Sequence, residues 1–268
     1  MSAPGRARAK RLPVTSTSAK DDNGSARGVG QGALIVTPTY NERANLEAFV
    51  EATLGAAPAA HILVVDDNSP DGTGMLADQI AARDSRVRVL HRRGKLGLGT
   101  AYVEGFQLGL SDGYRYLFEM DADLSHDPQH LPSFFRELEA GADIVIGSRN
   151  IAGGKVHGWG PGRHLLSKGG SLYSRLILGV DVRDLTSGYK AFTREAALAI
   201  FGEKVLSNGY SFQIEMTYRA LQRGLRVVEV PIVFVDREVG KSKMDRAIFA
   251  EAVLAVWKLR LSTLRTRR

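Results

Sequence analysis

Cysteine is absent from all 268 residues of the chain. This absence excludes disulfide bonds, thiolate nucleophiles and metal sites with cysteine ligands, and it fits a reducing compartment. No run of residues approaches the roughly 18 to 20 apolar residues that a helix needs to cross a bilayer. The first 32 residues also have no apolar core of the kind found in signal peptides. We therefore expect a cytoplasmic protein that is soluble or peripheral on a membrane.

Positive charge is concentrated at the two ends of the chain. The total net charge is +7, with +4 in residues 1–30 and +6 in residues 237–268, so the middle is slightly acidic. Two basic ends favour contact with an anionic surface, although solubilising tails would have the same composition. No basic strand interleaved with aromatic residues and no nucleic-acid recognition motif is present. We therefore expect no nucleic-acid partner.

Apolar runs alternate with helical segments through the first half of the chain. Residues 1–32 contain almost no large apolar residues and are predicted to be disordered. Strands that alternate with helices predict an α/β fold with a mainly parallel central sheet flanked by helices. The predicted strands are 33–37, 61–65, 87–90, 114–120 and 143–146, and the predicted helices are 41–57, 73–82, 100–110 and 128–140, with Asn41 and Asp127 as N-caps.

Polar side chains gather where these strands end. In parallel sheets of this kind, ligands bind beyond the carboxyl ends of the strands. The sequence therefore predicts one binding site at this edge of the sheet. The segments that would line it are Pro38-Thr-Tyr-Asn-Glu42, Asp66-Asp67, Asp121-Ala-Asp123 and Gly147-Ser-Arg149.

Asp121 and Asp123 directly follow the fourth predicted strand. Residues i and i+2 of an extended segment point the same way, so both carboxylates can reach one ion. Carboxylate oxygens suit Mg²⁺ or Mn²⁺. A solvated turn before a helix is one alternative, and a phosphatase resembling the haloacid dehalogenases, with the first aspartate as nucleophile, is another. An EF-hand is excluded, because His126 and Pro132 stand where its glycine and glutamate are required.

A glycine-rich segment at residues 94–99 has only a superficial likeness to a phosphate-binding loop. It lacks the Gly-Lys-Ser/Thr sequence, and Tyr102 stands where a third glycine of a dinucleotide fingerprint would be. We interpret the segment as a tight turn between a strand and a helix. Lys95 within it is free to face an anionic ligand.

Several longer blocks occur in a fixed order along the chain. Together they resemble family 2 glycosyltransferases of the GT-A fold, and the later blocks are similar to dolichol- or polyprenol-phosphate mannose synthases. The resemblance covers about residues 33–243, which we expect to be the catalytic domain. The earlier blocks are Pro38-Thr-Tyr-Asn-Glu42, Val65-Asp-Asp-Asn-Ser-Pro-Asp-Gly-Thr73, Lys95-Leu-Gly-Leu-Gly-Thr-Ala101 and Asp121-Ala-Asp-Leu-Ser-His126. The later ones are Gly147-Ser-Arg149, Asp184-Leu-Thr-Ser-Gly-Tyr-Lys-Ala-Phe192, Gly209-Tyr-Ser-Phe-Gln-Ile-Glu215, Glu229-Val-Pro-Ile232, Asp236-Arg237 and Gly240-Lys-Ser-Lys243.

The resemblance implies inverting transfer of mannose from GDP-mannose to a polyprenyl monophosphate lipid, with Mg²⁺ or Mn²⁺ as cofactor. A related enzyme with another donor, such as UDP-glucose, is the alternative. Catalytic roles are implied for Asp123, Arg149 and Arg163, of which the two arginines face the acceptor phosphate. Asp121, Asp123 and Ser125 are implied as metal ligands. Donor contacts are implied for Pro38, Tyr40, Glu42, Val65, Asp67, Asp121, Ala122, Asp123, Arg237 and Lys243.

The implied reaction explains why cations outnumber candidate bases in these blocks. The acceptor phosphate is already ionised near neutral pH, so it needs orientation by cations more than deprotonation by a base. The departing diphosphate gains charge that cations stabilise. His126 and His164 are therefore expected to cap, pack or line the site. Gln213 and Glu215 either anchor the start of a helix or contact sugar hydroxyls.

The end of the chain, residues 244–268, is predicted to form an amphipathic, basic helix. Its apolar side chains are too interrupted by charge for the helix to span a bilayer. It is expected to lie on a membrane surface, to dock on a partner, or to pack on the catalytic domain. A polyprenyl acceptor lies in the membrane, and many relatives carry C-terminal transmembrane helices that this sequence lacks. We therefore expect peripheral attachment to the cytoplasmic face, through this helix or through a separate membrane protein.

Overall fold

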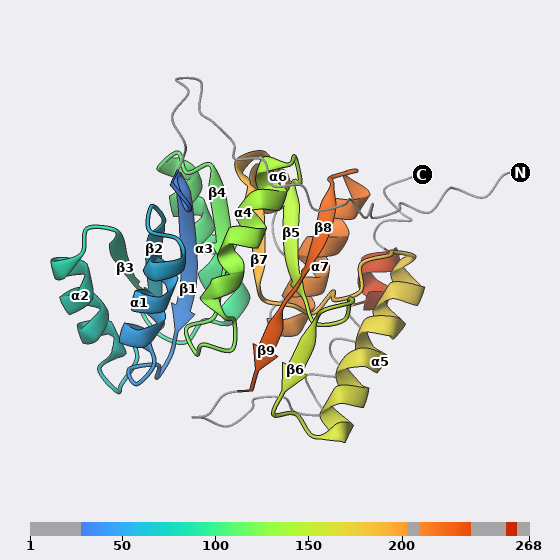
Figure 1. The fold of residues 1–268 in the computed structure, drawn as a ribbon, viewed down its shortest axis with the longest axis horizontal. Coiled ribbons are helices and arrows are strands. Elements are labelled where there is room, and N and C mark those ends of the chain that lie inside the picture. The colour runs from blue at the N-terminus through green and yellow to red at the C-terminus, as the bar shows by residue number, and fades with distance from the viewer. Residues whose placement is uncertain (1–27, 203–208, 237–255, 262–268) are drawn as a thin grey trace, which may run out of the picture.

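The computed structural model describes residues 28–202, 209–236 and 256–261. Within this part of the chain, a seven-stranded sheet has the order β3-β2-β1-β4-β7-β5-β8, and β6 pairs with β9 in a second, two-stranded sheet (Figure 1). All pairs are parallel except those of β7, which runs antiparallel to both of its neighbours. The strands are β1 (Ala33–Thr39), β2 (His61–Asp66), β3 (Val87–His91), β4 (Tyr116–Glu119), β5 (Ile144–Ser148), β6 (Lys155–His157), β7 (Lys190–Thr193), β8 (Val227–Pro231) and β9 (Val233–Val235).

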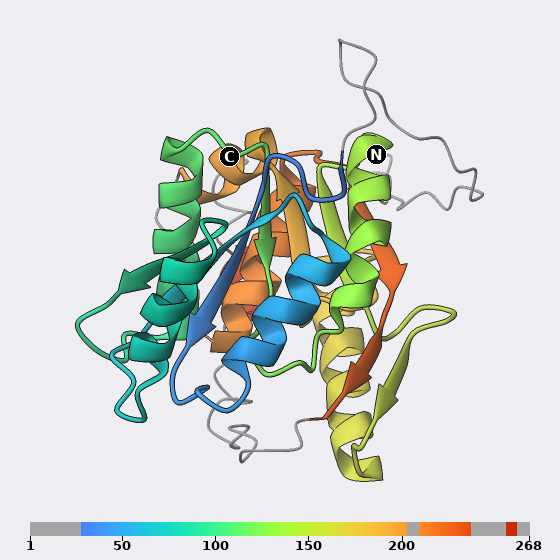
Figure 2. The same ribbon diagram turned by 60° about the vertical axis from the view of Figure 1, so that its left-hand side comes forward.

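Helices cover both faces of the seven-stranded sheet (Figures 1 and 2). The first hydrophobic layer lies between the sheet and α1 (Leu46–Ala56), α2 (Thr73–Arg83) and α4 (Leu131–Glu139). The second layer lies between the opposite face and α3 (Leu98–Ser111), α6 (Arg194–Phe201) and α7 (Gly209–Gln222), and it includes Val256 and Leu259. Two buried layers around one sheet confirm the predicted α/β class. The remaining helices are a short 3₁₀ turn, η1 (Pro128–His130), and α5 (Pro161–Leu178).

Each strand predicted from the sequence forms within a few residues of its expected bounds. Each predicted helix in the first half also forms, and Asp127 caps η1 as expected, since its side chain accepts a hydrogen bond from the Gln129 N–H at 2.9 Å. The N-cap predicted at Asn41 is wrong, because α1 begins at Leu46. The Glu42 and Arg43 N–H groups donate instead to Thr73 Oγ1 and Asp71 Oδ2. The loop after β2 therefore captures the donors that an earlier helix would have used.

The antiparallel strand β7 separates β4 from β5, although β4 and β5 follow each other along the chain. Glu119 of β4 lies opposite Lys190 of β7, and Ile146 of β5 lies opposite the same lysine on its other side. β7 therefore brings residues from the second half of the chain between two strands of the first half. The carboxyl ends of β4 and β5 stay on one edge of the sheet as a result.

The outer segments of the chain are described only in part. Of the segment predicted to be disordered, residues 28–32 form a turn in which Val29 O accepts a hydrogen bond from the Ala59 N–H at 3.0 Å, and residues 1–27 lie outside the described part. Of the predicted C-terminal helix, residues 256–261 are helical and the rest lies outside the described part. Among the described helices, none has the length and apolar character required to cross a bilayer.

Candidate active site

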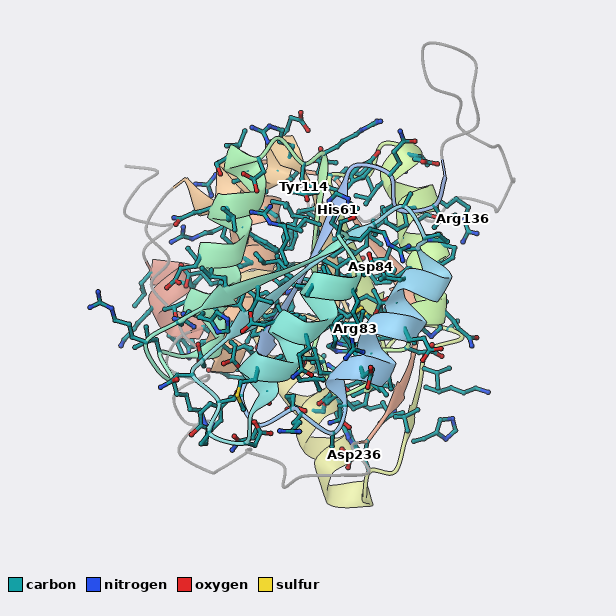
Figure 3. All side chains as sticks on the ribbon, turned by 90° about the vertical axis from the view of Figure 1, so that its left-hand side faces the viewer. His61, Arg83, Asp84, Tyr114, Arg136 and Asp236 are labelled. Carbon is teal, nitrogen blue, oxygen red and sulfur yellow. The ribbon has the colours of Figure 1, made fainter. Side chains whose placement is uncertain are left out.

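Unusual backbone conformations mark the carboxyl edge of the sheet. In the described part of the chain, three residues other than glycine have a positive φ: Asn41 at 61°, Asn68 at 57° and Leu124 at 59°. Each lies shortly after a strand, β1, β2 and β4 in turn. Asparagine adopts this conformation at little cost, but leucine does not, and residues held in such strain cluster at functional sites. In Figure 3, His61 and Tyr114 lie near the amino ends of their strands, and Asp236 lies at the opposite end of the molecule.

Asp66, the last residue of β2, and Asp67 directly after it make different contacts. Asp66 organises its own loop, since Oδ1 accepts hydrogen bonds from Thr39 Oγ1 at 3.0 Å and Ser69 Oγ at 2.6 Å. Asp67 instead pairs with Arg92, whose Nη1 lies 2.7 Å from Asp67 Oδ1. Burial raises the pKa of Asp67 above its ordinary value, and the Arg92 charge opposes this effect only in part. Asp67 is therefore a buried carboxylate whose charge is compensated by one arginine.

Arg92 was not predicted from the sequence, although it is central to this side of the site. Its side chain is 2% exposed, and its Nη2 donates to Thr100 Oγ1 at 2.5 Å. Its Nε lies 3.3 Å from Glu104 Oε2 on α3. The sequence carries no local signal for it, since Arg92 and Arg93 both lie shortly after the predicted strand 87–90. Arg92 thus connects the loop after β2 to the start of α3.

The residues predicted to bind the nucleotide lie at or just beyond the carboxyl ends of β1 and β2. Pro38, Tyr40 and Glu42 are half-buried, and Lys95 Nζ lies 4.4 Å from the centre of the Tyr40 ring. This arrangement places a cation of the loop 94–99 over an aromatic face. The expectation that Lys95 faces an anionic ligand stays a prediction. Val65 is fully buried in the second hydrophobic layer. Any ligand contact of Val65 would therefore involve its main chain and not its side chain.

The carboxylates of Asp121 and Asp123 are each fixed by neighbouring groups. Tyr102 OH donates to Asp121 Oδ1 at 3.0 Å, and the Asp121 N–H donates to His126 Nδ1 at 3.2 Å. Asp123 Oδ1 accepts from the Ser125 N–H at 3.1 Å and from Ser125 Oγ at 2.6 Å. The loop therefore presents two carboxylates in fixed orientations, with buried Ala122 between them.

The donor set at this loop fits a divalent cation shared with a phosphorylated ligand. Among the described residues, no three or more His, Cys, Asp or Glu side chains gather as a complete metal cage. Mg²⁺ commonly uses only one or two carboxylates and takes its other ligands from water and substrate phosphates. Asp121 and Asp123 match that pattern. Ser125 orients Asp123 through its hydroxyl, and its role as a direct ligand stays a prediction.

Arg149 is held by a buried carboxylate beyond the end of β5. Its Nε and Nη2 lie 2.7 Å from Asp184 Oδ2 and Oδ1, and Nη2 also donates to Thr186 Oγ1 at 3.0 Å. Burial raises the pKa of Asp184, but the Arg149 charge and hydrogen bonds outweigh it, so the pKa lies below its ordinary value. The guanidinium also lies 5.6 Å from the Trp159 ring centre. Arg149 is thus rigid, with Asp184 balancing its charge.

A pocket of about 270 Å³ opens beside Arg149. Because Asp184 balances the Arg149 charge, the net positive charge of the pocket comes from Lys155 and Lys168. Such a pocket suits an anionic group. Arg163 lies in the first turn of α5, one turn before Ser167, but its side chain and that of His164 are not among those described. The lining residues are Arg149, Asn150, Gly154, Lys155, Val156, His157, Trp159, Ser167 and Lys168.

The remaining predicted residues are buried or lie outside the described residues. Gln213 is 3% exposed and bonded to Lys190, and Glu215 is 0% exposed with Arg219 Nη2 at 2.6 Å from its carboxylate. These contacts favour the interpretation that both anchor α7, and sugar contacts stay a prediction. His126 stacks on Tyr189 with ring centres 5.1 Å apart, which matches the packing role expected of it. Arg237 and Lys243 lie outside the described residues.

Comparison with known proteins gives a family and a set of relatives. Residues 34–201 match the family described as Glycosyl transferase family 2. The chain is 50% identical over 233 residues to a polyprenol monophosphomannose synthase of Mycolicibacterium smegmatis, over 86% of this chain and 88% of that protein. It is 48% identical over 223 residues to an undecaprenyl-phosphate mannosyltransferase of Micrococcus luteus, over 83% of this chain and 91% of that protein.

Solved structures share the fold at low sequence identity. Glucosyl-3-phosphoglycerate synthase from Mycobacterium tuberculosis, in complex with Mn²⁺, uridine diphosphate and glucosyl-3-phosphoglycerate, has a TM-score of 0.60 at 21% identity. That match covers 87% of this chain and 80% of that one. A mannosyltransferase from Pyrobaculum calidifontis, in complex with GDP-Man and Mn²⁺, has a TM-score of 0.52 at 14% identity, over 89% of this chain and 77% of that one. These matches establish a common architecture.

Proposed function

Since the chain belongs to glycosyl transferase family 2, we propose that this glycosyltransferase moves mannose from GDP-mannose to a polyprenyl monophosphate. The products are GDP and polyprenyl-phosphate mannose. The observation that carries the proposal is the placement of two different sites on one sheet edge. The Asp121–Asp123 loop follows β4, the Arg149 pocket follows β5, and β7 alone stands between these strands. Two strand spacings amount to about 10 Å, a distance that a sugar between two phosphate groups can bridge.

Different groups of residues are proposed to bind the nucleotide, the diphosphate and the acceptor phosphate. Tyr40, Lys95 and the Asp67–Arg92 pair surround the nucleotide end. Asp121 and Asp123 orient the donor diphosphate through a divalent cation, Mg²⁺ or Mn²⁺, which when bound neutralises charge on the leaving group. Arg149, Lys155 and Lys168 hold the acceptor phosphate. Arg163 is proposed to join them.

The transfer step requires no strong base. A lone pair of an ionised acceptor oxygen forms a bond to the anomeric carbon while the bond to the GDP oxygen breaks, and the electron pair leaves with GDP. One displacement inverts the configuration of that carbon. Because Asp184 keeps Arg149 rigid, the acceptor phosphate meets a guanidinium that is already oriented. The arginine thus contributes orientation more than net charge.

Mannose transfer into lipid tests this proposal. With radiolabelled GDP-mannose, polyprenyl phosphate and Mn²⁺ or Mg²⁺, we expect label to enter an organic-extractable product. Asp123→Asn should reduce the rate by about 100-fold or more, because it removes charge that orients the metal and diphosphate. Asp127→Asn is the matched control, since asparagine also caps a helix and Asp127 holds the start of η1.

The identities of the donor and the acceptor are tested by comparing nucleotides and by trying several polyprenyl phosphates. Thermal unfolding in the presence of metal should shift upward with GDP more than with UDP. A shift with UDP alone, together with transfer only from UDP-glucose, would establish the rival donor. The absence of transfer to every polyprenyl phosphate tried would reject the proposed acceptor.

Attachment to the membrane is proposed to involve an exposed stripe on α5, consisting of Lys168, Leu172 and Leu176. These residues are four positions apart, so they share one face of the helix. Lys168 lines the pocket, whereas Leu172 and Leu176 are 53% and 72% exposed. A lipid whose phosphate occupies the pocket would find apolar surface next to it. The stripe supports a peripheral position on a membrane surface, and we propose the cytoplasmic face only from the resemblance.

The segment 256–261 supports the same position. Leu259 is buried in the second hydrophobic layer, and Arg260 Nη1 donates to Leu178 O at 3.5 Å, which ties the segment to the end of α5 (Figure 1). Trp257 and Leu261 remain 47% and 55% exposed. The segment therefore docks on the catalytic domain by one face and offers tryptophan and leucine on another, as interfacial helices do.

A further inference from the structure

A polar cluster is buried in the second hydrophobic layer beneath the Asp121 loop. It consists of Glu119 on β4, Lys190 on β7 and Gln213 on α7, which are 0%, 0% and 3% exposed. Glu119 and Lys190 lie directly opposite each other in the antiparallel pair. Side chains at i and i+2 of an extended segment share a face, so Glu119 lies on the same side of the chain as Asp121. A buried glutamate and lysine are costly, and packing alone gives no reason for them.

Lys190 determines how the Gln213 side chain is oriented. Lys190 Nζ donates to Gln213 Oε1 at 2.5 Å and to Gln213 O at 2.8 Å. Because an ammonium group only donates, Oε1 must face the lysine, and Nε2 must face the other way. Nε2 is buried beside the Glu119 carboxylate, and a hydrogen bond from the Gln213 side chain lowers the pKa of that glutamate. The hydrogen bond from Lys190 therefore fixes which way the Gln213 amide faces.

Gly188 shows that the Gln213 amide and Asp121 approach the same place. A Cβ added at Gly188 would lie 3.7 Å from Gln213 Nε2, 3.9 Å from Asp121 Oδ2 and 3.5 Å from His126 Cε1. The space beside this glycine is thus bordered by the amide, by the carboxylate and by the histidine that accepts the Asp121 N–H. The Gln213 amide of the cluster therefore lies beside the loop that carries the carboxylate pair.

The charges around Lys190 connect this loop to the acceptor pocket. Burial lowers the pKa of Lys190 to about 8, while Glu119 and Asp184 raise it and Arg149 lowers it. Burial likewise raises the pKa of Glu119 to about 7 against the opposing effect of Lys190, and Asp121 raises it further. Lys190 therefore lies between the Asp121 side and the Arg149–Asp184 pair, within electrostatic range of both.

We propose that Lys190 is a positioning residue that holds the Asp121 loop in its metal-binding geometry through Gln213 and Glu119. Its two hydrogen bonds fix α7 to the middle of the sheet, and its charge balances the glutamate under the loop. Without it, Gln213 can rotate and Glu119 is left buried without a cation. Partners that orient metal ligands from outside the coordination sphere typically contribute 10- to 100-fold to metal affinity or activity.

The test uses a charge-matched double variant, Glu119→Gln/Lys190→Met. It removes one negative and one positive charge, so the net charge beneath Asp121 is unchanged and only the positioning is lost. Binding of Mn²⁺ in the presence of GDP is measured on the full chain by the loss of the electron paramagnetic resonance signal of free Mn²⁺. We expect at least about tenfold weaker Mn²⁺ binding, with folding verified by circular dichroism. Thr217→Val is the control, because Thr217 Oγ1 also donates to Gln213 O, at 3.1 Å, but does not touch the amide.

If the double variant does not fold, a second variant tests the role of Lys190. Gln213→Met removes the amide and keeps both charged residues, and it should weaken Mn²⁺ binding as well. Mn²⁺ affinity within twofold of the wild-type value in the folded variants would overturn the inference. The inference rests on the proposed function in one respect, namely that the Asp121 loop binds a divalent metal. A wild-type chain that binds Mn²⁺ with GDP but transfers no mannose would reject the proposed function and leave the role of Lys190 intact.

Discussion

The guanidinium of Arg92 joins segments that are far apart in the sequence. It contacts Asp67 after β2, Gly97 O in the following loop, and Thr100 and Glu104 on α3. Asp67 is itself buried, so its carboxylate depends on this arginine for compensation. The orientation of Asp67, which is proposed to bind the nucleotide, is therefore set by a residue 25 positions away.

Replacing this arginine should affect both stability and nucleotide binding. Arg92→Met leaves the Asp67 carboxylate buried without its cation, and breaking a buried pair in this way costs about 3–5 kcal/mol. We expect a loss of that size in urea unfolding, together with weaker GDP binding in calorimetry. Arg86→Met is the control, because the Arg86–Asp84 pair is partly exposed and such pairs contribute at most about 1 kcal/mol. Equal losses in the two variants would contradict this account.

Individual site residues differ in how far the sequence reveals them. Asp121 and Asp123 could be predicted, because two carboxylates after an apolar strand form a local pattern. Arg92 could not, since its partner Asp67 is 25 positions away and nothing local distinguishes it from Arg93. The opposing charge of Asp184 on Arg149 is likewise a long-range contact, across 35 positions. Leu124 gave no signal, because its left-handed backbone is imposed by the loop around it.

At the scale of elements, the Arg149–Asp184 pair ties the end of β5 to the loop before β7. Asp184 has a lowered pKa in the folded chain, so its pairing stabilises the fold fully above the unfolded value of 3.8. That contribution is lost as the pH falls below 3.8 through the folded pKa. The connection between these two elements should therefore weaken in acid.

The contribution of the Arg149–Asp184 pair to stability can be measured by comparing the wild-type chain with Asp184→Asn. At pH 7 we expect the variant to be less stable by about 3–5 kcal/mol, because Arg149 loses its buried partner. The difference in unfolding free energy should begin to shrink as the pH is lowered to 3, since the unfolded chain binds a proton at Asp184 below pH 3.8, whereas the lowered pKa of the folded chain delays its protonation. Urea unfolding at pH 7, 5 and 3 provides the measurement. A difference that stays constant over this range would show that the Asp184 charge does not stabilise the fold.

The strands and helices differ in how far a local sequence pattern predicts them. Each strand of the first half has an apolar run that ends in turn residues, and each forms as predicted. β7 has four residues and begins with the buried Lys190, so it lacks such a run. No pattern in the sequence indicated that it would enter the sheet antiparallel between β4 and β5. The start of α1 was misplaced because Thr73 and Asp71 engage the backbone of residues 42 and 43 from another loop.

For the whole molecule, the exposed stripe on α5 gives the proposed membrane contact a direct test. Burial of a leucine side chain contributes about 1.5–3 kcal/mol, so Leu172→Ser/Leu176→Ser should reduce binding to vesicles by about tenfold or more. Co-sedimentation with vesicles of anionic phospholipid measures this effect for the full chain. Leu198→Ser is the matched control, since Leu198 is 50% exposed on α6 and lines no part of the pocket. Equal losses in both variants would show that α5 has no special role.

The position of β7 has a consequence for synthesis on the ribosome. β3, β2, β1 and β4 are contiguous in the sheet and consist of residues that leave the exit tunnel first. β5 emerges soon afterwards but has no neighbour in that half until β7, about 40 residues later in the chain, has been translated. Domains fold progressively as they emerge during synthesis. A nascent chain should therefore complete the half of the sheet that carries the proposed nucleotide site before the half that carries the proposed acceptor pocket can close against it.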